Sequence, residues 1–159
     1  MKKTRFLTNM KKEGKLEIIE PSEEVCRAYL EKANSNLESA KILASAGKTE
    51  EPISMAYYGM YNALSALLFK CGIKSENHAA SIMLLKEVFR QKELEKEISF
   101  GKKERIDKQY YLDFAATEKD ADEMIAKTGN FVSKIKVIIR TITNKEISEA
   151  RKELEEALK

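Results

Sequence analysis

The chain has 159 residues, of which 35% are charged, and its formal net charge is only +3. A chain of this length is the size of one domain and can bury a substantial core. The small net charge does not by itself indicate nucleic-acid binding. Two prolines and six glycines leave few helix breakers, so the composition favours helices joined by short turns.

Residues 1–20 form a basic N-terminal arm, with six lysines and arginines against three glutamates. The arm lacks the continuous apolar region and the small-residue cleavage site of a secretory signal. Phe6, Leu7 and Met10 form an apolar patch, which is consistent with a short helix that packs on another element. No stretch reaches the roughly 18 apolar residues typical of a membrane-spanning helix.

The two cysteines, Cys26 and Cys71, form neither a metal-binding nor a disulfide pattern. We therefore expect both to be buried free thiols. This cysteine usage is typical of a reducing compartment and predicts a cytoplasmic location.

Pro21 is suited to the first position of a helix, so we expect a helix to begin there. Apolar residues recur after it at steps of three and four, which predicts a first amphipathic helix that stops at Gly47. The second helix, residues 52–71, is apolar or aromatic at nearly every position, so we expect other helices to surround it. Its small residues at steps of three and four would let a neighbouring helix approach closely; these are Ala56, Gly59, Ala63 and Ala66.

A third helix is expected over about residues 78–91, capped by Asn77 or Ser75. Residues 92–101 continue as helix or turn and end at Gly101. A fourth helix over about 103–115 brings Ile106, Tyr110 and Phe114 onto one face.

Thr117 caps the fifth helix, with Asp120 in the capping-box position. The tail, residues 146–158, either extends the fifth helix or packs on a partner. No strand-like alternation competes with these helices. The sequence thus predicts an all-α, up-and-down bundle of four to five helices over residues 21–143, with the basic arm before it and a helical tail over 144–159.

Tyr57, Tyr58 and Tyr61 on the second helix, and His78 at the start of the third, have two interpretations. In the first, the tyrosine rings fill the core and the histidine bonds locally. In the second, the rings form a stacking platform for a base, with Asn62 as a hydrogen-bonding group, and His78 contacts a ligand, because helix N-termini accept anions.

Arg105, Asp107 and Tyr110 form the most informative polar cluster. Arginine either makes a bidentate contact with phosphate or pairs with a carboxylate such as Asp107 or Asp113. The sequence has no glycine-rich phosphate loop, no Cys/His metal cluster and a single histidine, so we expect neither a metal nor a cofactor.

In their order and spacing, three stretches resemble HEPN-domain proteins of the small prokaryotic, especially archaeal, type. They are Ala56-Tyr57-Tyr58-Gly59-Met60-Tyr61-Asn62-Ala63-Leu64 with Ala66-Leu67-Leu68, Gly72-Ile73-Lys74 through His78, and Arg105-Ile106-Asp107 through Tyr110-Tyr111. The likeness covers about residues 22–140. It implies a four- or five-helix bundle, often dimeric, that in many members accompanies a minimal nucleotidyltransferase in a toxin–antitoxin pair.

The resemblance also implies a second activity, because other members are metal-independent ribonucleases with an Arg-x(4–6)-His motif. Here positions 71–73, where the arginine would precede His78, hold cysteine, glycine and isoleucine. Arg105 is followed after four residues by Tyr110. Because an unperturbed tyrosine titrates near about 10, far above histidine, we do not expect acid–base cleavage of RNA.

Our first hypothesis is a non-catalytic HEPN-like protein, one half of a toxin–antitoxin-type pair, that binds a nucleotide or a nucleotidyltransferase partner. The binding residues would be Arg105, Asp107, Tyr110, His78, Tyr58 and Tyr61. One alternative is a metal-independent ribonuclease that binds RNA at an altered Arg-x4-Tyr site. Another is a structural module that forms a homodimer through its apolar helices.

Overall fold

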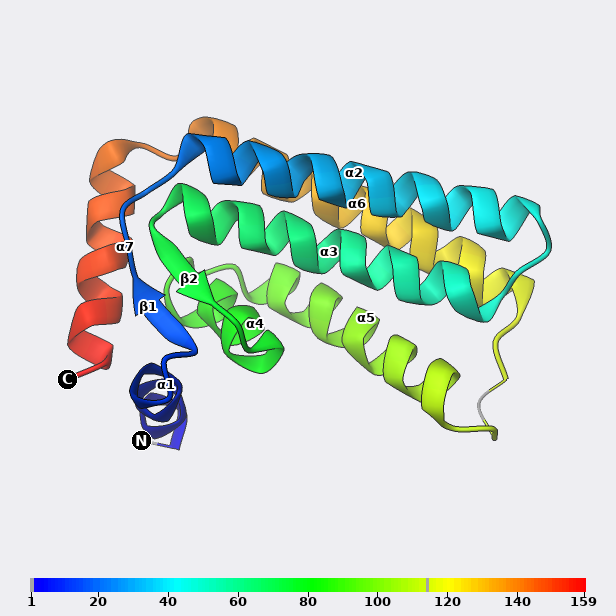
Figure 1. Cartoon of the computed structure of the whole chain (residues 1–159), viewed down its shortest axis with the longest axis horizontal. Coiled ribbons are helices and arrows are strands. Elements are labelled where there is room, and N and C mark those ends of the chain that lie inside the picture. Colours follow the sequence, from blue (N-terminus) through cyan, green and yellow to red (C-terminus); the bar gives the residue numbers. More distant parts are fainter. Residues whose placement is uncertain (1, 114) are drawn as a thin grey trace.

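The computed structural model describes residues 2–113 and 115–159, and within them it has seven helices and two short strands. In chain order these are α1 (Lys2–Lys12), β1 (Leu16–Ile18), α2 (Glu23–Ser45), α3 (Glu50–Lys70), β2 (Ile73–Ser75), α4 (His78–Glu87), α5 (Lys92–Tyr110), α6 (Glu118–Thr141) and α7 (Asn144–Ala157). The predicted all-α class is confirmed. Figure 1 shows the long helices α2, α3, α5 and α6 running beside one another, with α7 across one end. Both chain termini lie at that end.

Helix α3 is the centre of the core, as the apolar run predicted. Tyr57, Met60 and Leu64 are among its fully buried side chains. At Gly59 a Cβ would lie 3.2 Å from Thr128 Cγ2 and 3.4 Å from the Ala33 carbonyl oxygen, so α6 and α2 both approach the helix there. The expectation that small residues permit close helix packing is therefore confirmed at Gly59.

The helix starts agree with the predicted caps in two of three cases. Asn77 Oδ1 accepts a hydrogen bond from the Ala80 amide at 2.9 Å. Thr117 and Asp120 form the expected capping box at the start of α6. The prediction for Pro21 was wrong, because Ser22 caps α2 and Pro21 lies before the helix. A serine hydroxyl can accept from the first-turn amides, whereas proline cannot.

The predicted break at Gly101 is wrong, since α5 runs without interruption from Lys92 to Tyr110. A Cβ at Gly101 would lie 2.8 Å from Met124 Cε and 2.9 Å from Met60 Sδ. The glycine therefore makes room for side chains of α6 and α3 and does not end the helix. The expected end near residue 115 is also wrong, and Phe114 lies outside the described residues.

The two strands were not predicted, because three residues are too few for alternation to be recognised. β1 and β2 are antiparallel, with Leu16 opposite Ser75 and Ile18 opposite Ile73. Leu16 and Ile73 are fully buried. The pair ties the N-terminal arm to the segment before α4, and α1 packs there through its buried Leu7, consistent with the expected helix.

Helix α7 is separate from α6 and packs against its own chain. Ile147, Ala150 and Leu154 are buried. The Arg151 Nη1 atom donates to three backbone carbonyl oxygens, those of Ile19 (2.5 Å), Cys71 (3.2 Å) and Gly72 (3.0 Å). The tail is therefore part of the folded unit.

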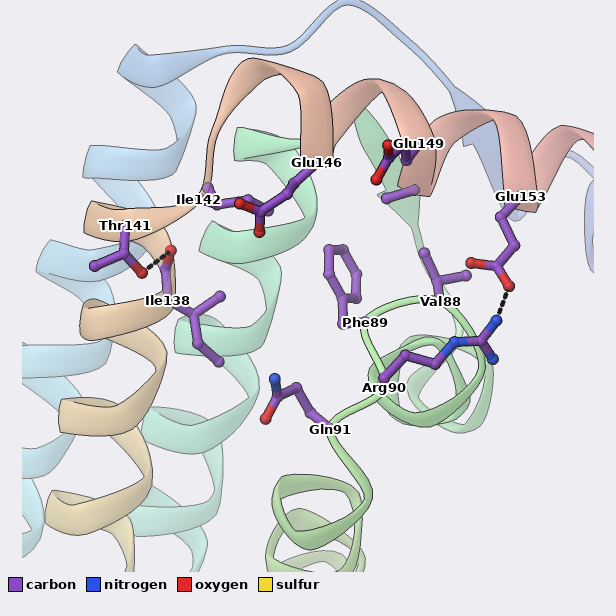
Figure 2. A pocket seen from close by; sticks show the side chains of 11 residues that line it. Val88, Phe89, Arg90, Gln91, Ile138, Thr141, Ile142, Glu146, Glu149 and Glu153 are labelled. Carbon is purple, nitrogen blue, oxygen red and sulfur yellow. Dashed lines mark hydrogen bonds and ion pairs between the residues drawn. The ribbon is translucent and has the colours of Figure 1, made fainter.

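A cavity of about 440 Å³ lies between α6, α7 and the α4–α5 connection. Figure 2 shows Phe89 at its centre, with Glu146 and Glu149 of α7 on one side. Arg90 forms an ion pair with Glu153 at its edge. None of the Tyr58, Tyr61, His78 and Arg105 side chains lines it.

Both cysteines are buried free thiols, as predicted. Burial raises the pKa of Cys71 to about 12. Among the helices of residues 2–113 and 115–159, none has the length and hydropathy needed to cross a bilayer.

Candidate functional site

Four of the six predicted site residues come together where α3, α4 and α5 meet. Tyr58 and Tyr61 lie on α3, His78 is the first residue of α4, and Arg105 lies on α5. Tyr57 joins them from α3, and we call these five residues the Arg105–tyrosine cluster. The hydrogen bonds of the cluster link positions as far as 47 residues apart in the chain.

His78 is held by a buried tyrosine. Tyr57 Oη lies 2.7 Å from His78 Nδ1, and the Tyr57 side chain is fully buried. Burial, together with the neighbouring Tyr61, raises the pKa of Tyr57 far above its usual value, so the phenol keeps its proton. The contact fits either tautomer of the neutral ring: the phenol donates to Nδ1 with the ring proton on Nε2, or Nδ1–H donates to the phenol oxygen.

The imidazole is neutral at physiological pH. Burial lowers the pKa of His78, and the positive charges of Arg105 and Lys102 lower it further. With the Tyr57 phenol as donor, the ring offers an N–H donor at Nε2, whereas with Nδ1–H as donor, Nε2 is a free acceptor.

Tyr61 supports the histidine from the other side. Its ring stacks on His78 with 3.7 Å between centroids and 15° between planes. The Tyr61 hydroxyl lies 3.2 Å from Ser81 Oγ, which in turn lies 2.8 Å from Ser75 Oγ. In this arrangement Tyr61 positions His78, and its ring face on that side is not open to a base.

Arg105 has no counter-charge among the described residues. Its Nη1 donates to Tyr58 Oη at 3.1 Å and to Gln109 Oε1 at 3.3 Å, and its Cζ lies 5.4 Å from the ring centroids of both Tyr57 and Tyr58. Its Nε is buried and has no hydrogen-bond partner among the described residues. The guanidinium therefore stands over two rings, and its buried Nε–H is left without a partner among the described residues.

Asp107 and Tyr110 do not join this cluster. Asp107 Oδ2 lies 3.3 Å from Lys103 Nζ, and the Tyr110 side chain is 65% exposed at the end of α5. A helix turns about 100° per residue, so residues two and five positions after Arg105 lie on roughly the opposite side of the helix from Arg105. Both side chains therefore point away from the cluster. The expected pair between Arg105 and a nearby carboxylate does not form within the described residues.

Sequence reasoning left Tyr57 and Ser81 out of the site. Tyr57 had a signal, because it lies one turn before Tyr61 and shares a helix face with it. Ser81 had none, since its contact with Tyr61 depends on how α4 packs against α3. Both residues act by orienting His78 and Tyr61.

A family model of the HEPN domain matches residues 26–138. The chain belongs to the HEPN family. A protein of Methanocaldococcus jannaschii that bears the name "putative toxin" is 29% identical over 126 residues, which are 75% of this chain and 92% of that protein.

In this HEPN chain the cluster draws its arginine and its histidine from different helices. His78 opens α4 and Arg105 lies on α5, and both contact Tyr57. Residues 2–113 and 115–159 contain no group of three or more His, Cys, Asp or Glu side chains that could hold a metal ion. The Arg105 guanidinium, which has no carboxylate partner among the described residues, and the neighbouring Tyr58 phenol form donors that suit an anion.

Proposed function

We propose that this HEPN chain is one half of a toxin–antitoxin-type pair and that its Arg105–tyrosine cluster binds the phosphate of a nucleotide. The family and the relative named as a toxin support the first part. One observation carries the second part: the buried Arg105 Nε has no partner, and no described carboxylate lies within ion-pair distance of the side chain.

The energetics of that donor favour an anion. A buried N–H left unpaired costs about 1–3 kcal/mol, and more when it is charged. A phosphate oxygen would satisfy it, because guanidinium groups commonly bind phosphate through two parallel hydrogen bonds. Lys102 adds positive charge near His78, which favours the binding of a phosphate there.

Calorimetry with AMP, ATP and adenosine tests this proposal. We expect the two phosphorylated ligands to bind and adenosine to bind more weakly. Arg105→Gln should reduce the affinity by about tenfold or more, because it removes a charge-assisted contact. Arg140→Gln, which changes an exposed arginine on α6, should leave the affinity unchanged. A folded protein that binds no nucleotide would contradict the proposal.

The partner we propose is a minimal nucleotidyltransferase, with a homodimer as the form that binds it. The end of α5 supports a protein partner, since Tyr110 is 65% and Leu112 is 99% exposed. Coexpression with a tagged nucleotidyltransferase should yield a complex that Leu112→Asp weakens. Sedimentation of the HEPN chain alone tests the dimer, which a monomer at micromolar concentration would exclude.

A second candidate function is metal-independent RNA cleavage. The observation that favours it is that Arg105 and His78 share Tyr57, although the sequence lacks the usual spacing between the two. Binding ranks first because the chain lacks the Arg-x(4–6)-His motif that the family's ribonucleases share, and because the phosphate proposal rests on Arg105 and not on a proton transfer by His78. Incubation with RNA in chelator decides between them: cleavage that Arg105→Ala and His78→Ala both abolish would favour the ribonuclease.

A further inference from the structure

A separate groove between α5 and α6 combines an exposed aromatic ring with several cations. It has a volume of about 400 Å³ and is lined by Lys96, Glu97, Phe100, Lys127, Asn130 and Lys134. The Phe100 side chain is 40% exposed. No residue of the Arg105–tyrosine cluster lines the groove, so it is a different surface.

The charges of this groove are unevenly paired. Lys134 Nζ lies 2.6 Å from Glu97 Oε1, and Lys96 is paired with Glu93 on its own helix. Lys127 has no carboxylate partner among the described residues, and its Nζ lies 3.8 Å from the centroid of the Phe100 ring. The Lys127 ammonium thus lies over the Phe100 ring, and the residues that line the groove include three lysines and one glutamate.

These groups match the chemistry that recognises unpaired nucleotides. A base stacks on an aromatic ring whatever its sequence, and lysines follow the phosphates on either side. A side-chain amide such as that of Asn130 can hydrogen-bond a base edge. A duplex would not fit this chemistry, because its bases are already stacked and paired.

We infer that the α5–α6 groove binds single-stranded nucleic acid, with a base stacked on Phe100 and an adjacent phosphate held by Lys127. Binding would move the Lys127 ammonium from the ring face to a phosphate, so that the cation–π contact is replaced by a stronger charge pair. This inference goes beyond the proposed function, because it uses other side chains and a polymeric ligand.

Fluorescence anisotropy with labelled oligouridine and oligothymidine of about ten nucleotides measures the binding. We expect binding at about 50 mM salt that weakens toward 200 mM. Phe100→Ala and Phe100→Leu should each weaken it by about tenfold, since both remove the ring, whereas Phe100→Tyr should retain it. Ile42→Ala, a change of an exposed apolar residue on α2, serves as the matched control and should have no effect.

A charge variant separates the phosphate contacts from stacking. Lys127→Gln should weaken binding by a few-fold and reduce the slope of log affinity against log salt by about 0.7. Lys41→Gln, on the exposed side of α2, should change neither quantity. Equal losses in the two lysine variants would mean that only the general charge of the protein attracts the strand, and the inference would be wrong.

Ultraviolet crosslinking places the strand on the protein. Trypsin releases residues 97–102 as one peptide, in which Phe100 is the only aromatic residue. We expect the crosslink on this peptide, and we expect it to persist in Arg105→Gln, which keeps the test independent of the nucleotide proposal. Three results would overturn the inference: no binding by the folded chain at low salt, duplex bound as tightly as single strands, or a dimer that Phe100→Ala dissociates.

Discussion

Two half-buried arginines in this molecule have opposite surroundings. Arg151 donates from Nη1 to three backbone carbonyl oxygens, at 2.5, 3.0 and 3.2 Å. Arg105 has a phenol and an amide oxygen as partners and two rings beneath it, and its buried Nε has no partner within residues 2–113 and 115–159. The first arrangement fastens chain segments together. The second leaves donor capacity unused, which lowers stability and makes the side chain available to a ligand.

The largest effect on stability is expected at Gly72, where the backbone lies against the Arg151 guanidinium. A Cβ there would overlap the Arg151 guanidinium and the Ile19 carbonyl oxygen, and φ is +70°, where side chains are strained. We expect Gly72→Ala to lower the free energy of unfolding by about 3 kcal/mol or more.

Gly14→Ala is the matched control for Gly72→Ala. Its φ is +71°, but nothing lies within 4 Å of an added Cβ, so only backbone strain of about 1–2 kcal/mol remains. Urea unfolding of both variants measures the difference. If the two variants lose the same free energy of unfolding, the overlap with Arg151 at Gly72 does not contribute to the destabilisation.

Arg151→Met should have the next largest effect. Methionine keeps the apolar stem but removes the donors, so three carbonyl oxygens lose a charged partner. We expect a loss of about 2–3 kcal/mol, with faster hydrogen exchange throughout α7. Unchanged exchange in α7 would mean that Ile147, Ala150 and Leu154 hold the helix without the arginine.

The sequence predicted the parts of this comparison that depend on local pattern. The apolar run of α3 and the caps at Asn77 and Thr117 follow from spacing and residue type. The choice of Arg105 and His78 as site residues stays a prediction. The role of Arg151 could not be predicted, because its acceptors are backbone atoms 79 to 132 positions away. For the same reason, the Tyr57–His78 contact and the continuous helix through Gly101 depend on tertiary packing.

Arg105→Met tests the other half of the comparison. Replacing a charge that is incompletely hydrogen-bonded by an apolar side chain of similar length is often neutral or stabilising. We expect the free energy of unfolding to change by less than about 1 kcal/mol, while nucleotide affinity is lost. A destabilisation as large as that of Arg151→Met would show that Arg105 is also structural.

The smallest expected effect is on the pH dependence of stability, through the titration of His78. NMR can follow this titration directly, because His78 is the only histidine in the sequence. Burial first, and then the charges of Arg105 and Lys102, lower its pKa below the usual 6.5. As pH falls below 6.5, the unfolded chain takes up the proton before the folded chain does. The stability contributed by the neutral ring is therefore complete above pH 6.5 and declines as the pH falls through the window beneath it.

Arg105→Met connects that titration to the cluster. Removing the guanidinium should raise the pKa of His78 part of the way toward 6.5, because burial still lowers it. The pH window over which stability declines should narrow accordingly, and His78→Asn should remove this contribution entirely. Arg151→Met gives the contrast, since Arg151 is not among the groups that shift His78. If Arg151→Met moves the histidine resonance as far as Arg105→Met does, the two arginines are not the separate structural and ligand-binding groups that their hydrogen bonds indicate.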